Sequence, residues 1–340
     1  MSAAPRFVAM FPGQGSHAVG MGRALYDASP AARATLDAAD AVLPGLLERM
    51  FDGPLEALTA TETQQPALLA AGAAAWAAWR EAGGPDAAAF AGHSLGEWTA
   101  HVAAGTLPLE AGVRLVARRG RFMQEAVPAG EGRMAAILKL DDDAVDAICD
   151  AVRAAGEGVV EVANRNAPGQ VVVSGDAGAV DAAARSAKAS GGRAVPLQVS
   201  APFHCSRMAP AADRLAAELA DVPFAAPRAP LWCNVDAAPL PDASAAADRL
   251  TRQVTAPVRW TEEVRALADA GPPTFVEFGG GRVLSTLVGR TLEGAATHVV
   301  HDPETLAATL AALGDTPEGG TRDGGAQEGG ARGAPGEDRS

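Results

Sequence analysis

The chain has 340 residues, 48% hydrophobic and 20% charged, a balance that fits a folded protein with a sizeable core. Its formal net charge of −13 excludes nucleic acids and anionic membranes as favoured partners, because both are themselves negatively charged. The spacing of Cys149, Cys205 and Cys233 fits neither a metal site nor a disulfide framework, so we expect reduced thiols and a cytoplasmic protein.

The sequence predicts no membrane segment and no signal peptide. Residues 1–11 lack a basic region followed by a long apolar run, which a signal peptide requires. The apolar run 66–79 is shorter than a membrane span and predicts a buried helix instead.

Strands and helices alternate in both ends of the chain. We expect strands at 6–11, 87–92 and 274–278, and helices at 65–82 and from Leu95 onward. The first strand ends in Pro12-Gly13-Gln14-Gly15, where two glycines allow a tight turn. This alternation predicts a large α/β domain with a parallel sheet covered by helices on both faces.

The middle of the chain predicts a second unit. Its expected order is strand, helix, strand, strand, helix, strand, at 134–140, 141–155, 159–162, 170–174, 176–189 and 193–199. This is the order of a ferredoxin-like fold. We therefore expect a discontinuous large domain at 1–126 and 201–313, with a ferredoxin-like domain inserted at 127–200. Residues 314–340 are rich in Gly, Pro and charged side chains and predict a disordered tail.

The sharpest local signal is a G-x-S-x-G motif, Gly92-His93-Ser94-Leu95-Gly96, between a predicted strand and a predicted helix. This is the setting of the nucleophile elbow in α/β-hydrolase-like domains. Its glycines permit a strained turn that exposes the serine beside the amides at the helix N-terminus, which favour developing negative charge. The motif predicts a nucleophilic Ser94, with a serine merely tolerated in a tight turn as the structural alternative.

A nucleophilic serine needs a base. The six histidines are His17, His93, His101, His204, His298 and His301. The His93 side chain should point away from that of Ser94, its neighbour in sequence, and His101 lies too far along the helix. An α/β-hydrolase would keep its base near the end of the chain, at His298 or His301, whereas His204 follows the predicted inserted domain. The residues alone leave these candidates open.

Several motifs resemble, in order, those of the malonyl-CoA:acyl carrier protein transacylase family, from Phe11 to about Leu313. They are Phe11-Pro12-Gly13-Gln14-Gly15-Ser16, Gly92-His93-Ser94-Leu95-Gly96-Glu97, Arg119-Gly120-Arg121-Phe122-Met123-Gln124, Asn164-Arg165-Asn166-Ala167-Pro168-Gly169-Gln170 and Phe203-His204. The resemblance implies transfer of malonyl from malonyl-CoA to the phosphopantetheine thiol of an acyl carrier protein, by a ping-pong mechanism. It places the reaction in fatty-acid or polyketide biosynthesis and implies neither a metal nor a bound cofactor.

The resemblance also implies catalytic roles. Ser94 would be the nucleophile and His204 its general base, then acid. Backbone amides of Gln14 and Leu95 would form the oxyanion hole. Gln253 falls where many members carry a glutamine and would support the histidine.

Substrate-binding roles follow in the same way. Arg119 would bind the free carboxylate of malonyl through two parallel donors of its guanidinium. The ring of Phe203 would fill the space that an α-methyl group needs, which favours malonyl over a branched group. Gln65, Met123 and Asn166 are implied as further substrate-binding positions.

Two other classes of function remain as alternatives. A serine hydrolase or thioesterase would use the same elbow, with its base at His298 or His301, and would not need Arg119. A non-catalytic scaffold that only binds carrier protein would keep the fold, but it has no physical need for both Ser94 and His204.

Overall fold

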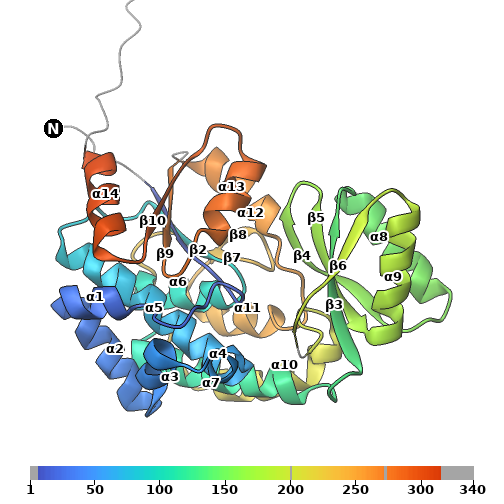
Figure 1. Cartoon of the computed structure of the whole chain (residues 1–340), viewed down its shortest axis with the longest axis horizontal. Coiled ribbons are helices and arrows are strands. Elements are labelled where there is room, and N and C mark those ends of the chain that lie inside the picture. Colours follow the sequence, from blue (N-terminus) through green and yellow to red (C-terminus); the bar gives the residue numbers. More distant parts are fainter. Residues whose placement is uncertain (1–6, 200, 272–273, 315–340) are drawn as a thin grey trace, which may run out of the picture.

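The computed structural model describes residues 7–199, 201–271 and 274–314. Two separate sheets form two lobes that lie side by side (Figure 1). Residues 315–340 of the predicted tail lie outside the described residues, as do Pro272 and Pro273 before the last predicted strand.

The sheet of the larger lobe is parallel, with the strand order β10-β9-β1-β2. Its strands are Val8–Phe11 (β1), Ala89–Gly92 (β2), Thr274–Phe278 (β9) and Ala296–Val300 (β10). Successive side chains of a strand point to opposite faces. In β1, Ala9 and Phe11 join one hydrophobic cluster, whereas Val8 and Met10 join another. Both faces of the sheet are therefore buried, as predicted.

Helices enclose this sheet. Before the second lobe come Arg23–Ala28 (α1), Pro30–Val42 (α2), Leu46–Asp52 (α3), Leu55–Thr59 (α4), Thr61–Glu81 (α5), Leu95–Ala104 (α6) and Leu109–Glu125 (α7). After it come Ala209–Leu219 (α10), Ala246–Arg252 (α11), Trp260–Ala270 (α12), Val283–Thr291 (α13) and Pro303–Gly314 (α14), with a short ribbon of Trp232–Cys233 (β7) and Ala238–Pro239 (β8). None of the helices in the described ranges is long and apolar enough to cross a bilayer.

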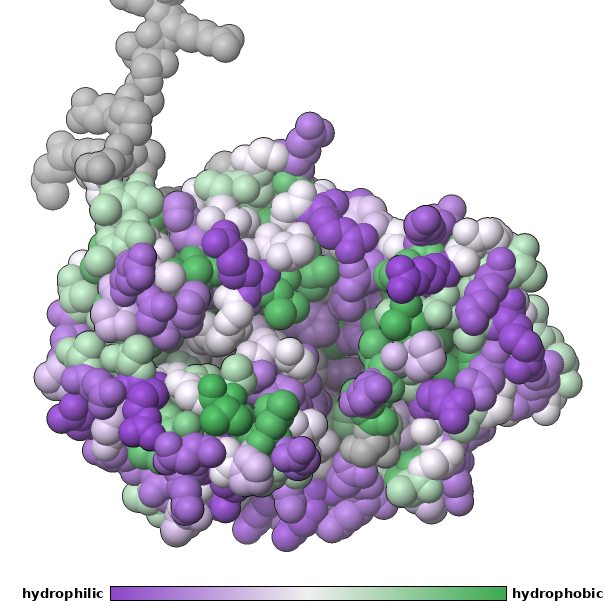
Figure 2. Space-filling model, in the orientation of Figure 1, coloured by the Kyte–Doolittle hydropathy of each residue, from purple (hydrophilic) through white to green (hydrophobic). Residues whose placement is uncertain are grey.

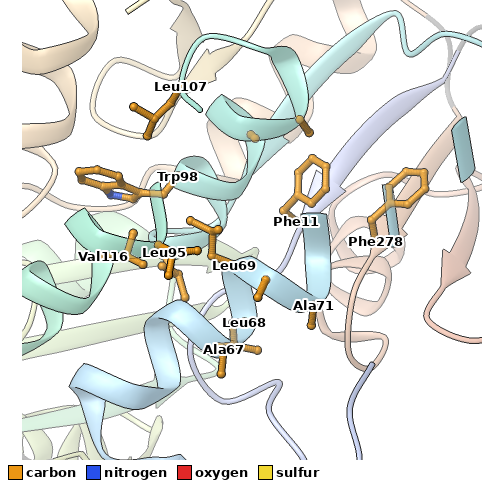
Figure 3. Close-up of a cluster of buried hydrophobic side chains, with 14 of the residues drawn as sticks. Phe11, Ala67, Leu68, Leu69, Ala71, Leu95, Trp98, Leu107, Val116 and Phe278 are labelled. Carbon is orange, nitrogen blue, oxygen red and sulfur yellow. The ribbon is translucent and has the colours of Figure 1, made fainter. Parts of the chain in front are cut away.

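Helices α5 and α6 pack on each other through a shared hydrophobic core. Figure 3 shows Leu69 of α5 beside Leu95 and Trp98 of α6, with Phe11 and Phe278 at the ends of their strands. The rings of Phe11 and Phe278 stack at 5.8 Å. Helix α5 is buried around most of its circumference, as predicted, but it begins at Thr61 rather than at Gln65. Its first turn is polar, so the apolar pattern of the sequence starts later than the helix.

The smaller lobe is an antiparallel sheet in the order β4-β5-β3-β6. Its elements are Gly132–Leu138 (β3), Asp142–Ala154 (α8), Val160–Ala167 (β4), Gln170–Asp176 (β5), Ala177–Ala189 (α9) and Arg193–Pro196 (β6). Side chains of both helices pack on this sheet in a separate hydrophobic cluster. The element order and strand order are ferredoxin-like, so the predicted fold class is confirmed.

All four strands of this lobe differ from the prediction at one or both ends, by at most two residues in β3 and β5 and by more in β4 and β6. Strand β4 continues to Ala167, because its pairing with β5 persists to the hairpin at Pro168-Gly169. Strand β6 ends at Pro196 instead of Val199, since proline has no N–H to donate to a ladder. The domain boundaries at 126/127 and 200/201 stay a prediction.

The space between the lobes is open. Figure 2 shows the surface hollowed between the larger and the smaller lobe. A cavity of about 710 Å³ is lined by Gln14, Gln64 and Phe203 and by residues 196–199, which directly follow β6. Its walls therefore come from the N-terminal part of the larger lobe and from the segment that leaves the smaller lobe.

Candidate active site

Ser94 lies at the turn from β2 into α6, in a strained backbone conformation. Its φ of 54° and ψ of −106° are rare for a residue with a side chain, and such strain costs about 1–3 kcal/mol. A Cβ on Gly92 would lie 2.1 Å from the carbonyl of Gly96, and one on Gly96 would lie 1.8 Å from the oxygen of Phe11. The two glycines of the motif therefore let α6 start directly against β1 and β2.

Two buried side chains hold this turn in place. The Ser94 N–H donates to Oδ1 of Asn234 at 2.7 Å. The Ser94 carbonyl accepts from Nε2 of Gln253 at 3.0 Å. Both amide side chains are fully buried, so the strained turn is fixed from two sides.

His204 is the histidine that contacts the serine. Its Nε2 lies 2.7 Å from Oγ of Ser94, and its Nδ1 lies 2.8 Å from the backbone carbonyl of Gln253. Because a carbonyl only accepts, Nδ1 carries the proton, and Nε2 accepts from the serine hydroxyl. The other predicted candidates lie elsewhere: His301 pairs with Asp302 at 3.4 Å, and His298 is on β10.

The charge state of His204 suits a base. Burial, assisted by the positive charge of Arg119, lowers the pKa of His204 to about 3. The ring is therefore neutral at neutral pH and has a lone pair free to take the serine proton.

The low pKa of His204 predicts that the rate of Ser94 acylation changes little as the pH falls from 7.5 to 5.5. A base with an ordinary pKa of 6.5 would be mostly protonated at pH 5.5, whereas this one stays neutral there. We expect the acylation rate at pH 5.5 to stay within about twofold of that at pH 7.5. Stopped-flow acylation across this range checks it, and a fall with a midpoint near pH 6.5 would contradict it.

Arg119 lies behind the serine as a fully buried cation on α7. Its Nη1 donates to Oε1 of Gln65 at 2.7 Å, and its Nη2 donates to Oγ of Ser94 at 3.2 Å and to Oε1 of Gln253 at 3.0 Å. A Cβ on Gly120 would lie 2.6 Å from the carbonyl of Thr61, so this glycine lets α7 approach α5 closely enough for these contacts.

The Arg119 guanidinium is positively charged but is not in direct contact with a negatively charged side chain. Burial lowers the pKa of Arg119 to about 10, while the charge of Glu97 opposes the shift, so the guanidinium is still a cation at neutral pH. Among the described residues, no carboxylate lies within ion-pair distance of it. A buried cation held only by neutral oxygens next to a nucleophile is suited to receive the carboxylate of a ligand.

The predicted oxyanion hole has free donors. The amide of Leu95 opens α6, and the amide of Gln14 lies in the loop after β1. In the part of the chain that the structure describes, neither amide donates to a protein acceptor. The side chain of Gln14 instead donates to Oε1 of Gln64 at 2.6 Å.

The remaining predicted positions fall into two groups. Gln65 and Met123 adjoin Arg119, with Nε2 of Gln65 lying 3.9 Å from Sδ of Met123, and Phe203 lines the 710 Å³ cavity. Asn166 is different, because its Oδ1 lies 2.8 Å from Nε2 of His93 and thus contacts the sequence neighbour of Ser94.

The thiol of Cys205, next to His204 in sequence, is poorly suited to act as a nucleophile. Sγ of Cys205 donates to the carbonyl of Pro202 at 3.1 Å, and burial raises the pKa of this thiol to about 11. The three cysteines are buried and unpaired. A thiol with so high a pKa has almost no thiolate at neutral pH, so Cys205 is expected to be inert.

The sequence assigned no role to three buried residues beneath the elbow. The N–H of Asn234 donates to Oε2 of Glu97 at 3.0 Å, and its Nδ2 donates to Oε2 of Glu263 at 2.9 Å. Burial raises the pKa of Glu97 to about 7 and that of Glu263 well above its usual value. For Glu97 a signal existed, because it is the one acidic residue of a helix, α6, in which most other residues are apolar.

Comparisons with known proteins agree with this geometry. Residues 7–310 match the model of the acyl transferase domain. The chain is 44% identical over 307 residues to the malonyl CoA-acyl carrier protein transacylase of Salmonella typhimurium, covering 90% of this chain and 99% of the relative. It is 43% identical to the protein of the same name from Bacillus subtilis, covering 89% and 96%.

Solved structures give the same picture. A malonyl CoA-acyl carrier protein transacylase from Coxiella burnetii superposes with a TM-score of 0.89 at 38% identity, over 92% of this chain and 99% of that one. A solved complex, described as a type II PKS acyl-carrier protein in complex with its malonyl-transacylase, contains a matching chain. That chain superposes with a TM-score of 0.87 at 42% identity, over 90% of this chain and 99% of that one.

Proposed function

Because the chain belongs to the malonyl-CoA:acyl carrier protein transacylase family of acyl transferases, we propose that it transfers malonyl through an ester on Ser94. Malonyl-CoA is the donor, and the phosphopantetheine thiol of an acyl carrier protein is the acceptor. The observation that carries the proposal is the contact of Ser94 Oγ with His204 Nε2 at 2.7 Å, directly beside the cation of Arg119.

In the first half-reaction, Ser94 Oγ forms a bond to the thioester carbon while its proton passes to Nε2 of His204. The carbonyl oxygen becomes an oxyanion, which the amides of Gln14 and Leu95 stabilise. When the tetrahedral intermediate collapses, the carbon–sulfur bond breaks, and the proton on His204 goes to the leaving CoA thiolate. The malonyl group is then an ester of Ser94.

The second half-reaction reverses these roles with another thiol. His204 takes the proton of the carrier thiol as its sulfur attacks the ester carbon. The oxyanion forms in the same hole, Ser94 Oγ leaves, and Nε2 of His204 returns the proton to it. CoA and the carrier arm therefore occupy the same cavity in turn, as a ping-pong mechanism requires.

Arg119 provides the selectivity for malonyl in this proposal. Its Nη2 already lies 3.2 Å from Ser94 Oγ, so an acyl group on that oxygen has its free end within reach of the guanidinium. The carboxylate of malonyl would give this guanidinium a charged acceptor in addition to the neutral oxygens that it contacts. Ser94, His204, Arg119 and two backbone amides supply every proton transfer and charge contact, so we propose that no bound cofactor takes part.

A cytoplasmic location is part of the same proposal. Unpaired cysteines persist in a reducing compartment, and the three cysteines of this chain are unpaired. The proposed reaction also needs the carrier to present a free thiol.

Ser94→Ala tests the acyl-enzyme. With malonyl-CoA, the unaltered protein should gain the mass of one malonyl group, and the variant should gain none, because the attacking oxygen is missing. Intact-protein mass spectrometry measures both. Cys205→Ala is the matched control and should load like the unaltered protein. Malonyl mass on Ser94→Ala at a comparable rate would disprove the assignment.

A further inference from the structure

A carboxylate that the transfer chemistry does not touch lies directly beneath the nucleophile. Glu97 is in the first turn of α6, and none of its surface is exposed. Its Oε2 accepts from the N–H of Asn234 at 3.0 Å and from Nε2 of Gln253 at 2.7 Å. Its Oε1 has no hydrogen-bond partner among the described residues. Burying an ionisable carboxyl group is costly unless it is hydrogen-bonded, and for Glu97 the two N–H groups of Asn234 and Gln253 provide these contacts.

Gln253 connects this carboxylate to the three groups that carry the proposed chemistry. Its Nε2 donates to Glu97 and to the carbonyl of Ser94, and its Oε1 accepts from Arg119 Nη2 at 3.0 Å. Its backbone carbonyl lies 2.8 Å from Nδ1 of His204. One residue thus holds the nucleophile's backbone, the base and the cation.

The two ends of the Gln253 amide are not interchangeable. If the amide turned by about half a revolution, its oxygen would face Oε2 of Glu97, which accepts N–H groups, and its NH₂ group would face the guanidinium of Arg119. Both contacts would be repulsive in a buried site, where unpaired polar groups are costly. Glu97 therefore fixes one orientation, in which the side-chain oxygen faces Arg119.

We propose that Glu97 is a positioning residue for malonyl selectivity: it fixes the Gln253 side chain so that this amide holds Arg119 beside Ser94. The inference rests on the proposed function, because it concerns the same malonyl site. Without Glu97, the Gln253 amide loses one of the contacts that fix its orientation, and it then holds the Arg119 guanidinium less firmly in one direction. Malonyl, which needs the guanidinium, is affected more than acetyl, which does not.

Three variants separate positioning from a loss of stability. Glu97→Met removes the acceptor at similar size. Glu97→Gln keeps a side-chain oxygen that can accept both N–H groups. Glu277→Met is the matched control, because Glu277 is also fully buried and also accepts two N–H groups, from Leu284 at 3.1 Å and Ser285 at 2.8 Å, but has no bond to Gln253.

The measurement is the ratio of malonyl to acetyl loading of Ser94, by intact-protein mass spectrometry, with the thermal midpoint of each variant. Glu97→Met should lower the ratio about tenfold or more, the effect of losing a hydrogen bond next to a charge, mainly through a higher KM for malonyl-CoA. Glu97→Gln should restore the ratio to within about threefold of the unaltered protein. Glu277→Met should lower the thermal midpoint and leave the ratio unchanged.

An unchanged ratio in Glu97→Met, or an equal fall in Glu277→Met, would overturn the proposal and leave Glu97 a structural residue. If Glu97→Met does not fold, Glu97→Asp gives the same readout, because its shorter carboxylate cannot reach both partners, and an unchanged ratio there would also overturn it. Failure of the proposed function looks different: the unaltered protein would then gain no malonyl mass at Ser94.

Discussion

Arg119→Ala should lose malonyl loading and keep, or even gain, acetyl loading. The guanidinium is fully buried beside Ser94, and its partners there are neutral oxygens of Gln65, Gln253 and the serine. A malonyl carboxylate that enters this site of the variant would be buried without a cation. Breaking a buried ion pair costs about 3–5 kcal/mol, which corresponds to a fall of about 10²–10⁴-fold in malonyl loading.

Acetyl responds in the opposite sense. An acetyl group in the unaltered protein leaves the guanidinium buried with no anion, and this penalises acetyl relative to malonyl. Alanine at position 119 removes that penalty together with the cation. The ratio of malonyl to acetyl loading at Ser94, measured under identical conditions, should therefore fall more than malonyl loading alone.

Arg118→Ala is the matched control for this prediction. Arg118 is next in sequence on α7, but its side chain is 42% exposed and pairs with Glu218. Arg118→Ala removes an arginine from the same helix but leaves the contacts around Ser94 unchanged. The ratio of malonyl to acetyl loading should therefore not change. A normal ratio in Arg119→Ala would mean that another group binds the carboxylate.

The elbow could be predicted from the sequence because it is local. Gly92, Ser94 and Gly96 are close in the chain, and their steric demands are properties of one turn between a strand and a helix. The parallel sheet and the ferredoxin-like unit were also predictable, because each depends on the order of short segments with recognisable patterns. Helix α5 shows the limit, since its polar first turn carries no apolar period to mark the start.

The supporting residues could not be predicted in this way because they are distant in sequence. Asn234 lies 140 residues from Ser94. No pattern near either residue predicts that the backbone N–H of Ser94 donates to the side-chain oxygen of Asn234. The position of Gln253 rested on the family resemblance, but its contact with Glu97 spans 156 residues and appears only in the folded chain. Tertiary packing alone brings these groups together.

Arg119 is an intermediate case. In the run Arg118-Arg119-Gly120-Arg121 it reads as one more surface arginine, and only the family resemblance indicated otherwise. The spacing of apolar residues along α7 indicates that Arg119 is buried. Val116 and Met123, three residues before and four after Arg119, are both buried, so Arg119 lies on the apolar stripe of α7 while Arg121 is exposed. A charged residue on such a stripe is a site candidate.

His204→Ala should slow acylation of Ser94 by about 10²–10⁴-fold, the usual contribution of a positioned general base. The neutral ring is oriented by the bond from Nδ1 to the carbonyl of Gln253 at 2.8 Å, and its Nε2 is 2.7 Å from the attacking oxygen. Alanine removes both the proton acceptor and the later proton donor. Both half-reactions should slow, so single-turnover loading from malonyl-CoA and unloading to the carrier thiol should fall together.

His301→Ala is the decisive comparison, because a serine hydrolase would keep its base late in the chain. His301 is half-buried and pairs with Asp302, whereas the Ser94 hydroxyl contacts His204. We expect loading of His301→Ala to stay within a few-fold of the unaltered protein. A large loss there, with near-normal loading of His204→Ala, would reverse the assignment of the base. Because the two histidines are far apart in sequence and have different partners, the pair of variants separates transfer through His204 from the hydrolase alternative in one rate measurement.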